Sequence, residues 1–261
     1  RISEAYAAYL LKETCDAQGR VVKHAVSTNT FNKHVILLVL VFRVLAKKAG
    51  MLSNPWADIA RKTENKISRR ELTVEELNTV CNQAKGELLT LFLLGIYTGL
   101  RLGDCCTLQW GEVDLSRRLI MRVPNKTARR RAVPVHVPIH VTLWEHLSKT
   151  PAAKRRDAVV PEFDEMYRQR MWDVSKLIQR HFEKCDIRVH RTGTGEGSKV
   201  RAVVEVGFHS LRHTFVSLCR QANAPLSVVE AIVGHSNPAM TRHYTHVGEL
   251  AAAAAVGALP S

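Results

Sequence analysis

The chain contains 261 residues, which is enough for one large domain or two modest domains that each bury a core of their own. Its formal net charge of +14 and its pI near 9.8 predict an anionic partner. Nucleic acid is favoured because the Lys and Arg residues are spread over many segments rather than confined to one tail. A basic surface on a protein that binds no nucleic acid is the less favoured alternative.

The composition argues against a disulfide framework and against a membrane protein. The six cysteines show no paired spacing and several lie in apolar runs, which is typical of reduced thiols in an intracellular protein. The most apolar run, residues 35–42, is too short to cross a bilayer and is followed by Arg43. The chain shows no signal peptide and does not begin with Met, which leaves open whether its first domain is complete at its start.

Residues 1–60 are expected to form a helical domain. Residues 1–16 place Ile2, Tyr6 and Leu10 on one stripe of a first helix, and a polar connection follows. The segment 27–30 (STNT) can cap a second helix that runs through the apolar stretch to Lys48.

Residues 61–71 are polar and strongly charged, which indicates a basic linker between domains. Arg69 and Arg70 in this linker are expected to contact DNA phosphates. The segment 73–76 (TVEE) has the pattern of a capping box and opens a second domain over residues 72–261.

The capping box opens the first helix of the second domain, and an apolar helix over residues 88–97 follows. Gly99 closes this apolar helix, so Arg101 follows a buried helix end. A buried guanidinium needs an anionic partner, and Asp104 is placed to hold Arg101 while leaving its outer edge free for a phosphate. The alternative is an Arg–Asp pair with a structural role alone.

Residues 118–123 and 132–137 read as two short strands of a hairpin, with Lys126 in the connection. Considered by itself, Lys126 is more typical of a solvated turn. Three arginines beside it are expected to touch the DNA backbone: Arg129, Arg130 and Arg131. Helices are predicted near 141–149 and along a stripe of Tyr167, Met171, Val174 and Ile178, and the Gly-rich segment near 190–199 is predicted to be a flexible turn.

The segment 207–247 concentrates polar side chains at spacings that a short helical region can bring together. His209 and Arg212 are three residues apart and share a helix face. Ser227 can cap the next helix, and Gly234 is suited to the left-handed residue that ends it. Five histidines in this region raise the possibility of zinc, but no ligand spacing typical of a metal site is present, so we expect no metal.

Three ordered motifs in this segment resemble the carboxy-terminal signature of the tyrosine recombinases, the phage-integrase family of site-specific DNA recombinases. They are residues 209–214 (HSLRHT), 233–236 (VGHS) and 241–244 (TRHY). The family also has an upstream arginine box, which residues 98–104 (TGLRLGD) resemble, and a lysine on a β-hairpin, which Lys126 matches by position.

The resemblance implies a fold, a chemistry and a set of roles. The fold is mainly α with small β-hairpins or a small sheet (α+β), in a two-domain clamp made of a helical core-binding domain and a catalytic domain. Six residues are implied to be catalytic, with Tyr244 as the nucleophile: Arg101, Lys126, His209, Arg212, His235 and Tyr244. Strand cleavage through a 3′-phosphotyrosine needs neither metal, ATP nor another cofactor.

The implied partner is double-stranded DNA with specific recombination sites. The alanine-rich tail, residues 249–261, is expected to form a helix that docks on a neighbouring subunit of a homo-tetramer on paired sites. The resemblance also implies that the protein is encoded by a bacterium or a phage and is located in the cytoplasm, associated with the nucleoid. Two alternatives stay open: a type IB topoisomerase that relaxes DNA, and a basic DNA-binding regulator without chemistry.

Overall fold

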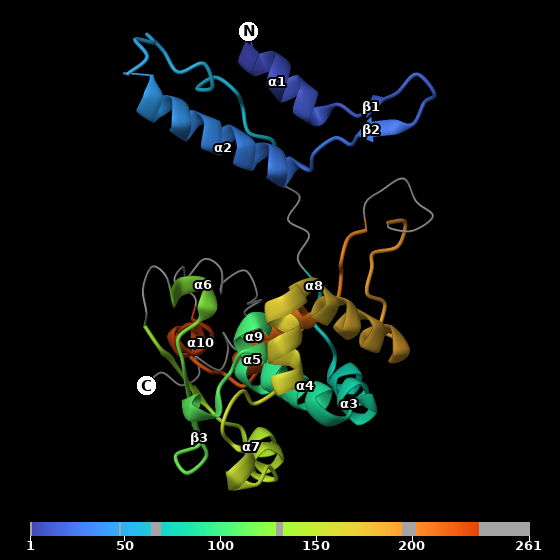
Figure 1. Cartoon of the computed structure of the whole chain (residues 1–261), viewed down its shortest axis with the longest axis vertical. Coiled ribbons are helices and arrows are strands. Elements are labelled where there is room, and N and C mark those ends of the chain that lie inside the picture. Colours follow the sequence, from blue (N-terminus) through green and yellow to red (C-terminus); the bar gives the residue numbers. More distant parts are fainter. Residues whose placement is uncertain (1, 47, 64–68, 129–132, 195–201, 235–261) are drawn as a thin grey trace, which may run out of the picture. The chain divides into compact units, whose positions relative to one another are not determined.

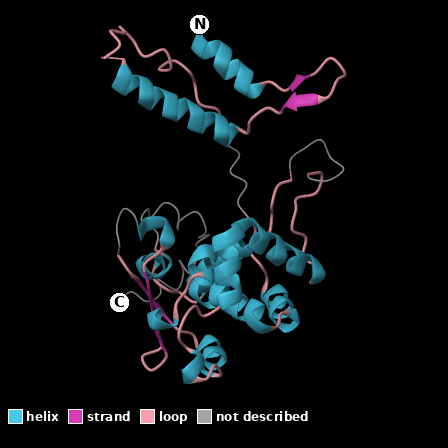
Figure 2. Cartoon of the chain, in the orientation of Figure 1, coloured by secondary structure: helices cyan, strands magenta, loops and turns pink. Residues whose placement is uncertain are grey.

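The computed structural model describes residues 2–46, 48–63, 69–128, 133–194 and 202–234, and the chain divides into two compact units. Unit 1 is Arg1–Ile67 and unit 2 is Ser68–Ser261 (Figure 1). The structure is mainly helical with two small antiparallel sheets, which confirms the predicted fold class (Figure 2). The predicted Arg129–Arg131 contacts, His235, Tyr244 and the tail helix fall outside the described residues.

The described residues of unit 1 form α1 (Ile2–Leu11), β1 (Thr14–Cys15), β2 (Val21–Lys23) and α2 (Thr28–Leu45). The prediction of a helix through residue 16 was wrong, since α1 ends at Leu11 and β1 pairs with β2. Residues 16–20 form a turn instead of continuing the helix. In this turn the Asp16 carboxylate accepts the backbone N–H groups of Gln18 and Arg20, and Gly19 adopts a positive φ of 77°.

The second helix of unit 1 begins as predicted. The Ser27 hydroxyl accepts the backbone N–H of Thr30 at 3.3 Å, which caps α2, but the helix ends at Leu45 rather than Lys48. A small core joins the two helices of unit 1 through four buried side chains: Ala7, Leu10, Phe31 and Val35.

The opposite face of α2 is apolar and exposed. Ile36, Leu40 and Val44 repeat every fourth residue along this face and each is about half exposed or more. In length and apolar composition α2 is the one described helix that reaches the range of a membrane span, with 17% of that span buried. Exposed apolar helix faces also mark protein contacts, so length alone does not assign α2 to a membrane.

Unit 2 holds the larger core. Its helices are α3 (Val74–Gln83), α4 (Gly86–Thr98), α5 (Leu102–Cys106), α6 (Asn125–Ala128), α7 (Val141–Ser148), α8 (Pro161–Lys184), α9 (Phe208–Gln221) and α10 (Leu226–Val233), with short 3₁₀ turns at Trp110–Glu112 and Ala152–Lys154. Its sheet has the order β3 (Val113–Asp114), β4 (Leu119–Arg122) and β5 (Val135–Pro138).

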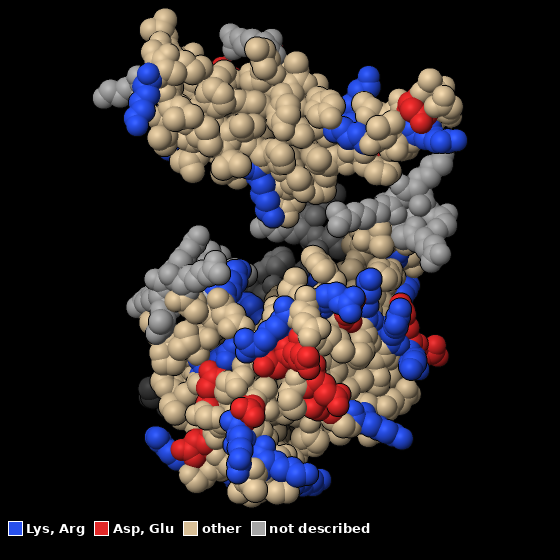
Figure 3. Space-filling view, in the orientation of Figure 1, with Lys and Arg blue, Asp and Glu red and all other residues tan. Residues whose placement is uncertain are grey.

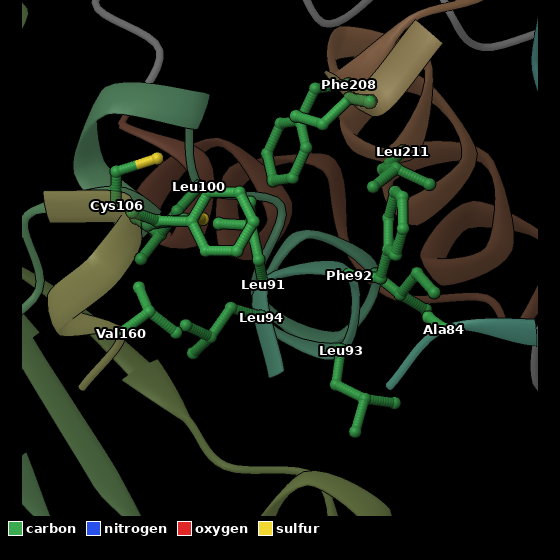
Figure 4. Close-up of a cluster of buried hydrophobic side chains, with 14 of the residues drawn as sticks. Ala84, Leu91, Phe92, Leu93, Leu94, Leu100, Cys106, Val160, Phe208 and Leu211 are labelled. Atoms are coloured by element: carbon green, nitrogen blue, oxygen red, sulfur yellow. The ribbon is translucent and has the colours of Figure 1, made fainter. Parts of the chain in front are cut away.

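Helix α4 runs through the middle of this core and is apolar on most of its circumference. Leu91, Phe92 and Leu94 have no solvent exposure. Figure 4 shows Leu211 of α9 beside Phe92, whereas Leu94 lies beside Val160. A helix that is hydrophobic all round is a buried helix. Gly95 lets α9 approach closely, since a Cβ there would lie 2.7 Å from Cζ of Phe208 and 2.8 Å from Cδ1 of Leu211.

The ends of α3 and α4 agree with the sequence prediction. Thr73 and Glu76 form the reciprocal capping box, in which each side chain accepts the other residue's backbone N–H. Gly99 ends α4 in the left-handed conformation, with φ at 60°. The chain therefore leaves the buried helix in a fixed direction just before Arg101.

The predicted hairpin is confirmed, and its connection contains a short helix. β4 pairs antiparallel with β5, and the opposed residues Ile120 and Val137 are both buried. Between these strands lies α6, on which Lys126 is exposed.

Two predictions for the later helices need correction. The stripe on α8 is buried at Val174 and Ile178, but Met171 is 40% exposed because the helix is kinked at Arg170, whose φ is −149°. Helix α10 is preceded by Pro225, so Ser227 lies inside the helix and does not cap it.

The cysteines are all free in the described part of the chain. Cys105, Cys106 and Cys185 are buried as expected, whereas Cys15 is exposed on unit 1.

The close approach of α4 and α9 gives a stability prediction. Replacing Gly95 with Val should lower the free energy of unfolding by more than about 2 kcal/mol, because overpacking a tight contact costs that order of energy. Gly111→Val is the matched control, since a Cβ at Gly111 meets nothing within 4 Å. Urea unfolding of both variants checks this, and equal stabilities would contradict the packing between α4 and α9.

Candidate functional site

A pocket of about 400 Å³ in unit 2 lies where four segments meet. Arg69 comes from the segment before α3, Arg101 from the start of α5, and His209 from the start of α9, while α8 contributes Tyr167 and Gln179. The described lining residues include two arginines and a histidine but no Asp or Glu. Such a pocket favours an anionic ligand.

Arg101 is the residue that directly precedes α5, and it follows the left-handed Gly99 by two positions. Within the described part of the chain its guanidinium makes no hydrogen bond or ion pair. The expected pairing with Asp104 is wrong, because the Asp104 carboxylate is turned to other partners. Arg101 is therefore open toward the pocket.

Asp104 belongs to a buried network centred on Arg122. Oδ1 of Asp104 lies 3.8 Å from Nε of Arg122 and accepts the backbone N–H of Asn125 at 2.7 Å. The same guanidinium donates to Glu112 at 2.7 Å and to the side chains of Thr107 and Asn125 at 2.6 and 2.9 Å. A buried ion pair is stable only with such additional hydrogen bonds.

This network has a consequence for Lys126. It ties α5, β4 and the first residue of α6 together, so the backbone next to Lys126 is held by Asp104. Lys126 itself is exposed and is not among the residues that line the pocket. Asp104 therefore holds the connection between β4 and β5 in place, and it does not hold the Arg101 side chain.

His209 is a neutral imidazole. Burial lowers its pKa to about 3, and the positive charges of Arg212, Arg69 and Arg101 together with His213 act in the same direction. Its ring is edge-on to that of His213, with centroids 4.9 Å apart. A neutral imidazole can accept a proton, which an imidazolium cannot.

Arg212 is 3% exposed and connects three helices. Its Nη1 donates to the carbonyl oxygen of Gly99 at 2.7 Å and its Nη2 to that of Val233 at 2.6 Å. The first carbonyl belongs to Gly99, the left-handed residue that ends α4, and the second belongs to Val233, which directly precedes the left-handed Gly234 at the end of α10. The guanidinium fork thus fixes the two chain turns that precede Arg101 and, in the sequence, His235.

Arg69 and Arg70 differ although they are adjacent. Arg70 donates both terminal nitrogens to the Glu76 carboxylate, at 2.8 and 2.6 Å, so its guanidinium is already bound within the protein. Arg69 lines the pocket, and burial lowers the pKa of its guanidinium from the ordinary value.

The structure therefore brings Arg69, Arg101 and His209 together in one pocket. Arg212 does not line this pocket but is buried near enough for its charge to act on His209. Sequence patterns did not predict that two further residues, Tyr167 and Arg122, belong to the site or its supporting network. Tyr167 packs its hydroxyl against Gly103 in the pocket, and burial raises the pKa of this phenol, so it remains protonated. Arg122 carries the Asp104 network, and its signal was a charged residue in an otherwise apolar strand.

The wider surface is mixed in charge. Lys and Arg side chains appear on both units, and on the visible face of unit 2 the acidic side chains gather in an area bordered by basic ones (Figure 3). The described residues contain no group of three His, Cys, Asp or Glu side chains that could hold a metal ion.

The phage integrase family model matches residues 70–250 of the chain. The tyrosine recombinase XerC of Bacillus pumilus is 26% identical over 84% of this chain and 71% of that protein. XerC of Mycobacterium tuberculosis is 30% identical over 58% of this chain and 46% of its own length, so the match spans about half of that relative.

Solved structures of DNA recombinases share the fold. A Tn1549 transposon integrase in complex with circular intermediate DNA has a TM-score of 0.67 at 16% identity, covering 98% of this chain and 84% of that chain. XerA recombinase gives 0.54 at 18% identity over 99% and 82%. Lambda integrase residues 75–356 bound to DNA gives 0.58 at 18% identity over 80% and 71%.

The lowered pKa of His209 makes a pH prediction. Its imidazole should show no titration between about pH 8 and pH 5, where an ordinary histidine is half protonated near pH 6.5. The unfolded chain binds one more proton than the folded chain below that pH, so this residue should make stability fall with acidification by about 1.4 kcal/mol per pH unit.

NMR titration of the imidazole and urea unfolding from about pH 7 to pH 5 test this. In the His209→Asn variant, the contribution of His209 to the pH dependence of the unfolding free energy should be lost. A His209 imidazole that titrates near the ordinary value would contradict the buried, positively charged setting.

The bridge made by Arg212 predicts a structural effect besides any catalytic one. Arg212→Lys replaces a two-pronged donor with a single ammonium, so one buried carbonyl loses its donor and the free energy of unfolding should fall by about 1–3 kcal/mol. Arg168→Lys on α8 is the control, because the Arg168 pair with Asp164 is 63% exposed on the arginine side and surface pairs contribute less than about 1 kcal/mol. Equal denaturation midpoints for the two variants would rule out the bridging role.

Proposed function

Because the chain belongs to the phage integrase family of tyrosine recombinases, we propose that it cleaves and rejoins DNA strands at specific sites through a 3′-phosphotyrosine intermediate. The observation that carries this proposal is the pocket, where Arg101 and neutral His209 line a cavity without a carboxylate among the described lining residues. That combination suits a phosphodiester, which needs positive charge at its oxygens and a proton acceptor near its nucleophile.

Tyr244 is the proposed nucleophile. Its hydroxyl oxygen attacks the scissile phosphorus, a bond to the 5′ oxygen breaks, and a 3′-phosphotyrosine and a free 5′-hydroxyl result. The tyrosyl ester retains the energy of the phosphodiester, so a second 5′-hydroxyl can reverse the step without ATP.

The other five residues divide the charge and proton work. Arg101 and Arg212 hold the non-bridging oxygens. A guanidinium has five N–H donors, so Arg212 keeps donors for the phosphate besides the two that it gives to Gly99 and Val233. A free tyrosine has a pKa near 10, and His209 in its neutral form accepts the tyrosine proton. His235 donates a hydrogen bond to the phosphate, and Lys126 protonates the departing 5′ oxygen.

In this scheme the guanidinium groups neutralise the phosphorane charge, which is the role that metal ions fill in other phosphoryl-transfer enzymes. The proposed partner is double-stranded DNA carrying a recombination site, and relatives in the same fold were solved with DNA bound. We further propose that two domains, residues 1–60 and 72–261, both bind DNA and are joined by the linker 61–71. Residues 249–261 join the subunits of a tetramer on paired sites. The protein acts in the bacterial cytoplasm.

The decisive variant is Tyr244→Phe, which removes the nucleophilic oxygen alone. We expect wild-type protein to form a denaturant-resistant adduct with members of a pool of nicked DNA duplexes that carry a randomised central segment, and the variant to form none. Gel electrophoresis under denaturing conditions and sequencing of the recovered DNA measure the adduct and identify the site.

Tyr97→Phe is the matched control, because it deletes a phenol oxygen in the same unit but outside the pocket. The wild-type reaction should also proceed in EDTA. An adduct with Tyr244→Phe would sink the assignment of the nucleophile, and DNA binding without any adduct from the wild-type protein would favour a non-catalytic regulator.

A further inference from the structure

The backbone that carries Arg69 is fastened to three parts of unit 2. The Arg70 backbone N–H donates to the Glu205 carbonyl at 3.0 Å, and the Leu72 backbone N–H donates to the Thr214 hydroxyl at 2.9 Å. Arg70 is bound to Glu76, and Glu71 accepts the Ser217 hydroxyl on α9. These four attachments hold the residues that directly follow Arg69.

The Arg69 side chain points to the start of α9. Its Nη1 and Cζ atoms lie 3.6 and 3.8 Å from the position that a Cβ atom on Gly207 would occupy. Gly207 is the residue before α9, and Arg69, Gly207, His209 and Arg101 line the same pocket. Arg69 is therefore a pocket residue, although in the sequence it belongs to the basic linker.

The Arg69 guanidinium has no counter-charge in the described part of the chain, where it makes no hydrogen bond or ion pair. The nearby carboxylates are committed elsewhere: Glu71 to Ser217, Glu76 to Arg70, and Glu205 to Arg188 at 3.1 Å. A partly buried cation without an anionic partner is unfavourable. A ligand that brings negative charge into the pocket removes this cost.

The electrostatics of His209 give independent support. The positive charge of Arg69 contributes to the lowered pKa of His209, as do Arg101 and Arg212. All three guanidinium groups therefore lie within electrostatic range of one imidazole. An anion bound among them would be near both the proton acceptor and the arginines.

We propose that Arg69 is a third arginine of the active site, which donates hydrogen bonds to the DNA phosphodiester held by Arg101 and Arg212. This inference rests on the proposed function, because it assigns Arg69 to the same phosphate. The proposed role of Arg69 differs from that of ordinary contacts between a basic protein and the DNA backbone. Those contacts strengthen DNA binding but do not change the rate of strand cleavage. A donor placed on the charge that develops in the transition state affects the rate.

The first arm of the test uses inorganic phosphate alone as the probe. Phosphate should shift the NMR signal of the Arg69 Nε–H group and raise the pKa of His209 in the wild-type protein. Arg69→Met keeps the apolar stem and should weaken phosphate binding about tenfold, the loss of one charge-assisted contact. Arg156→Met removes one exposed positive charge outside the pocket and should bind phosphate like the wild type.

The second arm uses the nicked duplex recovered in the adduct selection. At saturating DNA, Arg69→Met should form the covalent complex about 100-fold more slowly than the wild type, a loss typical of one transition-state donor. Arg69→Lys should recover part of the rate because it restores the charge without the fork. Thermal unfolding confirms that each variant is folded.

The outcomes separate this inference from the proposed function. If phosphate binding depends on Arg69 but the wild-type protein forms no adduct with DNA, the anion site is supported and the proposed recombinase chemistry is overturned. An active wild type whose Arg69→Met variant matches Arg156→Met in both arms would overturn the role of Arg69. Weaker DNA binding with an unchanged rate at saturation would also overturn it, since Arg69 would then be a backbone contact alone.

Discussion

The two-pronged hydrogen bond of Arg212 is the interaction on which the geometry of the pocket depends. By holding Gly99 and Val233 through their carbonyl oxygens, one buried side chain on α9 joins the ends of α4 and α10. Arg101 follows the first of these ends, and His209 lies one turn before Arg212 on the same helix. A planar guanidinium suits this task because its donors diverge at a fixed angle, so the two helix ends are held at a set separation.

The arginines around this bridge are of two kinds: some form ion pairs with carboxylates of the protein, and others line the pocket without a carboxylate partner among the described residues. Arg70 and Arg122 are neutralised by carboxylates within the protein and therefore stabilise the fold. Arg69 and Arg101 face the pocket without such partners in the described residues. The same electrostatic setting holds His209 neutral. An anion bound in this pocket would supply the missing negative charge and would raise the pKa of the His209 imidazole.

Local sequence signals correctly predicted the start of α3, the end of α4 and the hairpin, because caps and left-handed glycines act within a few residues, as at Thr73 and Gly99. They failed where distant segments compete for one group. Asp104 was assigned to Arg101 by proximity in the sequence, yet Arg122 and Asn125 bind it from the neighbouring strand and helix. Tyr167 was recognised only as part of an apolar stripe, and its place against Gly103 depends on how α8 crosses α5.

Peptide mass spectrometry of the covalent complex can determine whether DNA becomes attached to Tyr244 through its 3′ phosphate. After nuclease and protease digestion we expect one modified peptide, with a nucleotide joined to the Tyr244 oxygen. The strand released before digestion should carry a free 5′-hydroxyl. Attachment to Tyr167, the tyrosine that lines the described pocket, or a linkage through a 5′ phosphate would contradict it.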